Sequence, residues 1–463
     1  MKKMGATEEL VDFCSSLTYK DFPPEVIDKV KYHALDFMGV AARGSLVESS
    51  KVMFGLIKDM GSDPKGSVVI GTDMRALCQY AALANGTSSH SLDMDDVSNE
   101  ASVHPAVVIF PAAFAAGELA GCDGKKFTEG VLLGYEVMVR LGIAQNPMSL
   151  YARGFYPTAI CGIFGAAVAA SKILDLNKEQ MLSALGIAGS QAAGIMEFMN
   201  SGGWTHRMHT GWAAHNGILA ALLAERGFKG PSAIIEGRYG FLRCYSDGSD
   251  LSKVLANLGD SYEITKISVK PYACCRYEHG SIDGILRIMK DHNLKAAEVK
   301  DVILGILKAG WGIIAEPIEL KRNPKTVVDA IASMPFGAAV AILYGKASVD
   351  EYTQENVDSP KIKELMNKVS CVQDPELERV FPKQWPATVE IVTKDGRRFS
   401  TRIDYPKGDP ENPFSWEELI DKYNDLSSLV YSQGRRNEIL RRLKALEDEK
   451  KMADFCSLLL TNT

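Results

Sequence analysis

Apolar segments rich in alanine and glycine dominate residues 1–265. Four of them share this character: FTEGVLLGYEVMVRLGIAQ, AICGIFGAAVAASKILDL, KEQMLSALGIAGSQAAGI and GWAAHNGILAALLAERGF. Their apolar residues recur at helical spacing, and small side chains on an apolar face let neighbouring helices approach closely. We therefore expect a mainly α protein with a large all-helical domain, whose central helices are packed on all sides.

The pattern changes near residue 262. YEITKISVKPY alternates β-forming residues and predicts a strand, and VKDVILGILKAG fits a strand or a buried helix. WPATVEIVTKDGRRFSTRIDYP predicts a β-hairpin, because Asp395-Gly396 is a turn signal. Ser415 and Glu418 fit a capping box that restarts helices near the C-terminus. The predicted divisions are a helical domain over 1–265, a smaller α+β lid domain over 266–405 and a return to the helical domain over 406–463.

Charge and composition exclude several classes of function. The formal net charge is -6 and no basic stripe is visible, which argues against nucleic-acid binding. No apolar run is long enough for a membrane span, and no GxGxxG follows a predicted strand, which disfavours a dinucleotide enzyme. The first residues lack a secretory h-region, and the nine cysteines are scattered without a CxxC pair. We therefore expect reduced thiols and a cytoplasmic protein.

Four polar stretches interrupt the apolar segments. The first is HSLDMDDVSNEASVHPA, residues 90–106; the others are YARGFYPTAICG, SGGWTHRMHTGWAAH and VKPYACCRYEHGSID. The last three place cations just before a predicted helix, where free N–H groups and the helix dipole favour a carboxylate or phosphate. A single histidine or aspartate at a helix end is more often a cap than a catalyst, and we expect Asp95 and Asp96 to hold the shape of the first stretch. Three such sites in one chain fit a substrate with more than one carboxylate.

With these motifs the sequence resembles the MmgE/PrpD family, which includes 2-methylcitrate dehydratase, cis-aconitate decarboxylase and iminodisuccinate epimerase. The resemblance rests on HSLDMDDVSNEASVHPAVVIFPA, GFYPTAICGIFGAAVAASK, GGWTHRMHTGWAAHNGILAALLAERGFKGP, KPYACCRYEHGSIDG and PKGDPENPFSWEEL, and it covers essentially the whole chain. It implies a large helical domain built from both chain ends and a smaller α+β lid. It also implies a homodimer that acts on a small di- or tricarboxylate without a metal or organic cofactor.

The resemblance also assigns residues. The family's aspartate in the first motif matches Asp93, the histidine of its His-Pro pair matches His104, and the lysine of the fourth motif matches Lys270. Three positions depart from the common pattern, in which histidine, lysine and tyrosine are usual: here they are Tyr156, His206 and Phe336. Tyrosine and histidine can still exchange protons or donate hydrogen bonds, so these departures concern the substrate more than the presence of a site.

The chemistry shared by this family is proton removal or delivery at the carbon next to a carboxylate. We expect His104 to be the leading acid or base, oriented by Asp93, because a carboxylate partner fixes the tautomer of an imidazole. Tyr156 and His206 are candidates for a second proton relay, and Lys270 completes the predicted catalytic set. The candidates for substrate binding are Arg207, His209, Arg276, Arg153 and Tyr272.

A lyase that dehydrates a hydroxy di- or tricarboxylate is the leading expectation. An epimerase of a related dicarboxylate and a cis-aconitate-type decarboxylase are the alternatives. Two interpretations that do not involve a cofactor-independent lyase also stay open. One is a non-catalytic binding protein, and the other is a metal site, since carboxylates with imidazoles suit Mn²⁺, Fe²⁺ or Zn²⁺; its candidate ligands are His90, Asp93, Asp95, Asp96 and His104.

Overall fold

A computed structural model describes residues 4–461 of the chain. Contacts divide the chain into two units. Unit 1 comprises the chain up to Ser91, Asp95–Ile267 and the chain from Ser415 on, while unit 2 comprises Leu92–Met94 and Ser268–Phe414. Unit 1 is helical and unit 2 is α+β, so the predicted fold class is confirmed. The sequence placed the changes of unit at 265/266 and 405/406, whereas the contacts place them at 267/268 and 414/415 and also group Leu92–Met94 with unit 2.

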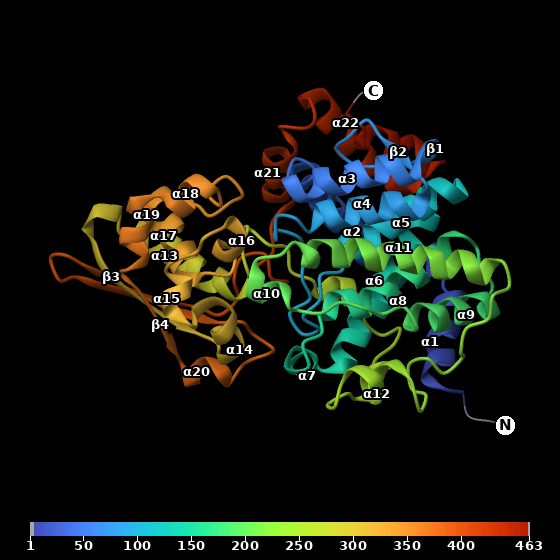
Figure 1. The fold of residues 1–463 in the computed structure, drawn as a ribbon, viewed down its shortest axis with the longest axis horizontal. Coiled ribbons are helices and arrows are strands. Elements are labelled where there is room, and N and C mark those ends of the chain that lie inside the picture. The colour runs from blue at the N-terminus through green and yellow to red at the C-terminus, as the bar shows by residue number, and fades with distance from the viewer. Residues whose placement is uncertain (1–3, 462–463) are drawn as a thin grey trace. The chain divides into compact units, whose positions relative to one another are not determined.

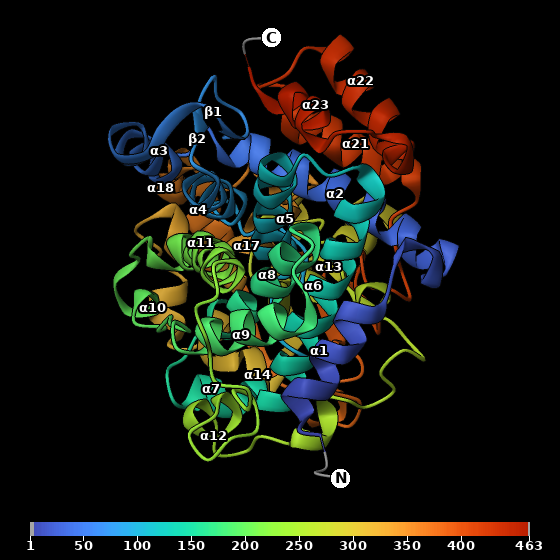
Figure 2. The same ribbon diagram turned by 90° about the vertical axis from the view of Figure 1, so that its right-hand side faces the viewer.

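Unit 1 is a bundle of helices with one small two-stranded sheet. Its elements are α1 Ala6–Ser16, α2 Pro24–Gly44, α3 Glu48–Gly61, β1 Ser62–Val68, β2 Arg75–Ala76, α4 Cys78–Ser89, α5 Ala106–Ala120, α6 Gly124–Gln145, α7 Pro147–Ala152, α8 Pro157–Ile173, α9 Lys178–Gly189, α10 Phe198–Ser201, α11 Thr205–Glu225, α12 Phe241–Tyr245, α21 Trp416–Ser427, α22 Gln433–Lys444 and α23 Met452–Cys456. Helix α8 packs against α5, α6, α9 and α11 (Figure 2), and every residue of α8 is buried. The expectation of central helices packed on all sides is therefore confirmed for α8.

Helices α4 and α11 cross at two glycines. A Cβ atom on Gly86 would lie 2.5 Å from the Cα of Gly211, and one on Gly211 would lie 2.2 Å from the carbonyl oxygen of Leu83. Thr210 Oγ donates a hydrogen bond to the Gly86 carbonyl at 2.8 Å, which fixes the crossing further. Because only glycine allows backbones this close, the crossing brings the last turn of α4 beside the first turns of α11.

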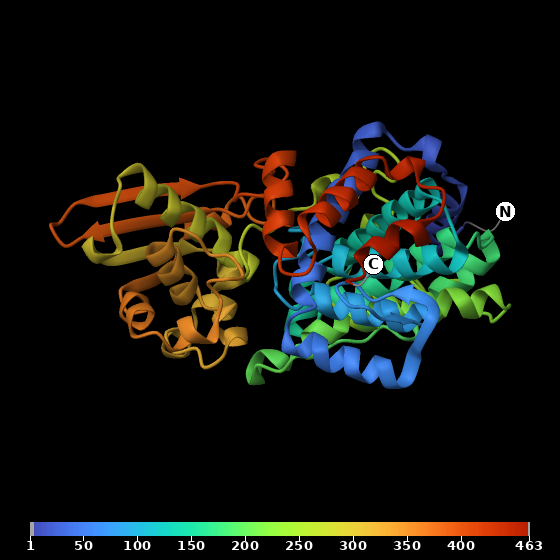
Figure 3. The same cartoon turned by 90° about the horizontal axis from the view of Figure 1, so that it is seen from above.

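The C-terminal segment completes unit 1. Helix α21 packs against α2, and α23 packs against α5, so segments from both chain ends lie side by side (Figures 2 and 3). Lys422 on α21 forms a buried ion pair with Asp36 on α2. The capping box of Ser415 and Glu418 begins α21, as the sequence predicted.

Unit 2 contains a four-stranded sheet in the order β4-β3-β5-β6, with β3 and β4 parallel and the other neighbours antiparallel (Figure 1). The hairpin β5-β6 turns at Asp395-Gly396, as predicted, and Gly396 has φ +88°. Its elements are α13 His279–Asp291, β3 Val299–Ile306, α14 Lys308–Gly310, α15 Ile318–Lys321, α16 Val327–Ala330, α17 Met334–Tyr344, α18 Gln354–Asp358, α19 Pro360–Met366, β4 Val369–Gln373, α20 Pro375–Glu378, β5 Ala387–Thr393 and β6 Arg398–Ile403.

The strand predicted in YEITKISVKPY is wrong. Glu263–Lys266 form a turn of 3-10 helix, and no strand begins in this stretch. Alternating β-forming residues adopt a strand only where a neighbouring strand pairs with them. Within residues 4–461, no helix combines the length and the apolar character required to cross a membrane.

Candidate active site

His90 lies at the centre of a buried cluster in unit 1. It is the C-cap residue of α4, directly after Ser89, and 1% of its surface is exposed. Its Nδ1 lies 3.0 Å from Asp95 Oδ1, and its Nε2 lies 2.7 Å from the hydroxyl of Tyr156, which precedes α8. An ionised Asp95 accepts from Nδ1–H, so Nε2 accepts the proton of the Tyr156 hydroxyl.

Asp95 joins two histidines. Its other oxygen, Oδ2, lies 3.0 Å from His104 Nδ1, which also lies 2.8 Å from the carbonyl oxygen of Asp96. Burial raises the pKa of Asp95, but the adjacent imidazoles of His90 and His104 lower it more, and it lies well below the ordinary value of 3.8. Asp95 is therefore ionised at neutral pH, and it holds the proton of His104 on Nδ1.

This arrangement corrects one predicted role. The sequence assigned the orientation of His104 to Asp93 and gave Asp95 only the task of shaping the loop. In the structure the carboxylate at His104 Nδ1 is that of Asp95. With Nδ1–H committed to Asp95 and to the Asp96 carbonyl, His104 presents Nε2 as the nitrogen that can exchange a proton with a substrate. The His104 side chain is partly exposed.

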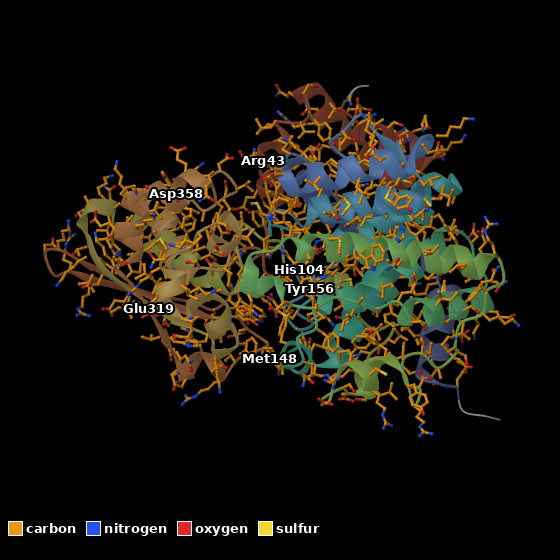
Figure 4. The ribbon with its side chains drawn as sticks, in the orientation of Figure 1. Arg43, His104, Met148, Tyr156, Glu319 and Asp358 are labelled. Carbon is orange, nitrogen blue, oxygen red and sulfur yellow. The ribbon has the colours of Figure 1, made fainter. Side chains whose placement is uncertain are left out.

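Aromatic rings surround this hydrogen-bonded chain. The ring centroids of His90 and His206 lie 5.7 Å apart, and those of Tyr156 and His209 lie 5.9 Å apart. Phe198 contacts the rings of Tyr156, His206 and His209 and forms an apolar wall beside them. Figure 4 shows His104 and Tyr156 near each other in this cluster. The structure thus gathers four predicted residues, His104, Tyr156, His206 and His209, around His90.

His209 makes the stability of the protein depend on pH. Burial, with a smaller contribution from His90, lowers its pKa from 6.5 to about 4. Between these values the unfolded chain binds a proton that the folded chain does not bind, so stability falls as the pH drops from 6.5 towards 4. We expect the denaturation midpoint in urea to fall less between pH 7 and pH 5 for His209→Asn than for the unmodified protein. Parallel pH dependences of the two midpoints would contradict this origin.

The two predicted arginines of unit 1 have different surroundings. Arg207 is buried on α11, and its Nη1 donates to Ser49 Oγ at 2.9 Å. Arg153 is exposed and pairs with Asp247 at 2.9 Å, so the structure does not bring it into the His90 cluster. His215 is buried on α11 with Asn216 as its partner.

The remaining predicted residues belong to unit 2. Lys270 is buried, and its Nζ donates to the carbonyl oxygen of Asp93 at 3.0 Å and to Asp93 Oδ1 at 2.9 Å. Asp93 has φ +53°, a left-handed conformation that aspartate tolerates better than most residues. The turn allows the carbonyl and the carboxylate of one residue to face the same ammonium group.

Acidic side chains hold the other two candidates of unit 2. The hydroxyl of Tyr272 donates to Asp283, and Arg276 forms a buried ion pair with Asp409. Arg276 also has two buried nitrogens, Nε and Nη1, without a hydrogen-bond partner, which suits a residue that binds an anion. Phe336 is fully buried on α17 and its ring contacts Tyr352.

Sequence reasoning did not place His90 and Asp95 in the catalytic set. Both stand in the first polar stretch, and His90 ends a helix that is buried at almost every position. That burial was the available signal, because a histidine at the end of a buried helix must find polar partners. The partners themselves, Asp95 and Tyr156, follow only from the folded loop.

His90, Asp95 and His104 form the one group of possible metal ligands found among the described residues. Their candidate ligand atoms lie within 4.8 Å of one another. The Nδ1 atoms of both histidines lie 3.0 Å from the carboxylate, a distance typical of hydrogen bonds. A metal ion bound by these three atoms would have to replace both hydrogen bonds, so the present geometry suits proton transfer better than coordination.

Comparison with known proteins identifies the family. The sequence model of the MmgE/PrpD N-terminal domain matches residues 8–253, and that of the MmgE/PrpD C-terminal domain matches residues 272–447. The chain belongs to the MmgE/PrpD family. The predicted resemblance is confirmed, and like its characterised MmgE/PrpD relatives this protein is a lyase.

Several named members of the MmgE/PrpD family align with nearly the whole chain. The cis-aconitate decarboxylase of Aspergillus terreus is 28% identical over 94% of this chain and 92% of its own length. The cis-aconitate decarboxylase of Homo sapiens is 27% identical over 100% of this chain and 95% of its own length. The 2-methylcitrate dehydratase of Salmonella typhimurium is 22% identical over 86% of this chain and 85% of its own length.

Proposed function

We propose that this lyase is a decarboxylase that acts on an unsaturated tricarboxylate of the cis-aconitate type. The similarity to cis-aconitate decarboxylases is higher and covers more of the chain than the similarity to 2-methylcitrate dehydratases. It supports the decarboxylase alternative over the dehydration that the sequence placed first. The observation that carries the chemistry is the hydrogen-bonded chain from His104 through Asp95 and His90 to Tyr156.

Decarboxylation of such an acid needs one proton donor. When a carboxylate on the carbon next to the double bond leaves as CO₂, its bonding electron pair moves through the double bond. The pair arrives at the carbon beside another carboxylate, and that carbon takes up a proton. We assign this proton to Nε2 of His104, since the ionised Asp95 stabilises the imidazolium that carries it. His206 and His209 are proposed to contact substrate, and Lys270 and Arg276 remain predicted carboxylate binders.

Dehydration of a hydroxy acid is the second candidate. It needs a base for the C–H proton and an acid for the leaving hydroxyl. The chain of hydrogen bonds has two ends that can carry protons, His104 and Tyr156, so it could also serve a reaction with two proton transfers. An epimerase would use the same two ends on opposite faces of one carbon.

One assay separates these reactions. The purified protein is incubated in D₂O with cis-aconitate and with a panel of hydroxy di- and tricarboxylates, and the solution is followed by proton NMR with capture of CO₂. We expect CO₂ release from cis-aconitate and one deuterium in the product, with activity retained after exhaustive chelation. An unsaturated acid formed without CO₂ identifies a dehydratase, and deuterium exchange without net conversion identifies an epimerase. A panel left wholly unchanged would contradict every lyase assignment.

A homodimer is part of the proposal, and an exposed apolar surface of unit 1 supports it. On α3, Val52, Leu56 and Met60 are 61%, 52% and 60% exposed and stand one helical turn apart. At the start of α11, the exposed side chains of Trp204, which caps the helix, and of Met208 and Trp212 on it repeat the same spacing. Such stripes on a helix usually face another element.

The two stripes lie on one side of unit 1. Tyr80 on α4 stands between them, because it contacts Gly61 at the end of α3 and the ring of His215 on α11. Helices α3, α4 and α11 follow one another down this side in Figure 2. A second copy of the chain would cover both stripes in a symmetric interface, in which the same surface serves both subunits.

Light scattering after gel filtration tests the dimer. We expect the mass of two chains for the unmodified protein and of one chain for Leu56→Glu combined with Trp212→Glu, because each glutamate would be buried without a partner. Leu429→Glu is the control: Leu429 is 65% exposed just after α21 and belongs to neither stripe, so its variant should remain dimeric. A monomeric unmodified protein at micromolar concentration would contradict the dimer.

A further inference from the structure

Asp96 stands next to the cluster but makes a separate set of contacts. Its side chain is fully buried in unit 1. Oδ1 accepts a hydrogen bond from the backbone N–H of Ala106 at 2.8 Å, and Oδ2 accepts one from the Tyr135 hydroxyl at 2.8 Å. Nδ1 of His33 lies 3.3 Å from Oδ2. Holding the shape of the first polar stretch, the role that the sequence predicted, is therefore only part of what Asp96 does.

The groups around Asp96 come from three helices. His33 belongs to α2, Tyr135 to α6 and the N–H of Ala106 to the first turn of α5. The His33 and Tyr135 side chains are fully buried, and their rings lie 5.9 Å apart. Contacts from three rigid elements leave the Asp96 side chain little freedom, and the backbone of Asp96 is fixed with it.

The backbone of Asp96 reaches the proton donor of the proposed reaction. Its carbonyl oxygen lies 2.8 Å from His104 Nδ1, closer than the carboxylate of Asp95 at 3.0 Å. We propose that Asp96, held by the Tyr135 hydroxyl and the N–H of Ala106, is a positioning residue that sets the tautomer and the ring orientation of His104. Neither the Asp96 nor the Tyr135 side chain needs to touch the substrate. The catalytic part of this inference rests on the proposed function, but the tautomer of His104 does not.

The variant that tests the proposal is Tyr135→Phe. It removes one hydrogen bond to Asp96 and keeps the ring that packs in the core. We expect kcat to fall about tenfold with KM unchanged, since a small misplacement of a catalytic group weakens the transition state without weakening substrate binding. Nitrogen-15 NMR of labelled histidine, with His104 assigned from the spectrum of His104→Gln, should show that the neutral form of His104 in the unmodified protein is the Nδ1–H tautomer. In Tyr135→Phe it should show a mixture with the Nε2–H form.

Tyr431→Phe is the matched control. Tyr431 is also buried in unit 1, and its hydroxyl donates to the Leu459 carbonyl at 2.7 Å, so the variant loses a comparable hydrogen bond elsewhere. It should lower the denaturation midpoint without changing kcat or the His104 signals. If Tyr135→Phe does not fold, Asp96→Asn is measured instead with the same expectations.

Two results would overturn the proposal. One is an unchanged kcat together with unchanged His104 signals in Tyr135→Phe; the other is an equal fall in kcat in Tyr135→Phe and Tyr431→Phe. Should the protein have no decarboxylase activity at all, the NMR measurement still decides whether Asp96 fixes the His104 tautomer, so failure of the proposed function and failure of this inference are distinguishable.

Discussion

Replacing Asp95 with asparagine should lower kcat about a thousandfold and leave KM nearly unchanged. The carboxylate serves two imidazoles: Nδ1 of His90 lies 3.0 Å from Oδ1 and 3.1 Å from Oδ2, and Nδ1 of His104 lies 3.0 Å from Oδ2. An asparagine of the same shape has only one oxygen, and its amide group faces the other histidine with a donor. That histidine must then carry its proton on Nε2. Its Nε2 can then no longer accept a proton, as it does in the unmodified protein. In a serine protease the same kind of substitution, which forces the wrong tautomer, costs about 10⁴ in kcat.

The measurement is the NMR assay of turnover, combined with urea denaturation to show that the variant is folded. Asp123→Asn is a suitable control, because Asp123 caps α6 and asparagine caps a helix equally well. It should change neither kcat nor the denaturation midpoint. An Asp95→Asn enzyme with normal kcat would exclude the shared carboxylate from the mechanism.

Asp95 also predicts the direction of a pH effect. Because its pKa in the folded protein is depressed below 3.8, it contributes stability that is present above this value and is lost as the pH falls through the lower, folded-state pKa. The Asp95→Asn variant should lack this loss. This loss of stability occurs only at acid pH. The activities of the two proteins are therefore compared at neutral pH, where it does not occur.

Gly211→Ala should destabilise unit 1 by about 3 kcal/mol, at the upper end of what overpacking a core costs. The new Cβ would lie 2.2 Å from the Leu83 carbonyl oxygen and 2.7 Å from Thr87 Oγ1. Backbone atoms cannot move aside as a flexible side chain can, so α4 and α11 must separate. His90 ends α4, and His206 and His209 stand on α11, so activity should fall along with stability.

The same substitution at Gly434 provides the control. Gly434 lies in α22, and no atom stands within 4 Å of the position that its Cβ would take. Alanine favours a helix over glycine, so Gly434→Ala should stabilise the protein by about 0.5–1 kcal/mol. The test is the urea denaturation of both variants; if both changed stability in the same direction, the close crossing of α4 and α11 would not be the cause.

Local patterns in the sequence were sufficient for much of the fold. The alanine- and glycine-rich pattern predicted α8 and its burial, Asp395-Gly396 predicted the turn of a hairpin, and Ser415 with Glu418 predicted the start of a helix. These features depend on neighbours along the chain. The stretch at 262–272 failed because a strand also needs a partner, which alternation alone does not provide.

The candidate site was predicted only in part. Residue types and motif order identified His104, Tyr156 and His206, because polar groups between apolar segments are conspicuous. They could not decide which of three nearby aspartates serves His104. That choice depends on the left-handed turn at Asp93, which sends its carboxylate to Lys270 and leaves Asp95 to the histidines. A backbone conformation at one non-glycine residue has no reliable signature in a single sequence.

The ion pair between Asp36 and Lys422 has a consequence for how the protein is made. Helix α2 emerges early from the ribosome, yet the ammonium group that neutralises its buried carboxylate is synthesised only after almost the entire chain. Until then the core of unit 1 holds an unpaired charge, and an unpaired buried charge strongly destabilises a fold. We therefore expect a chain truncated before α21, which lacks Lys422, to fold less stably than the full chain.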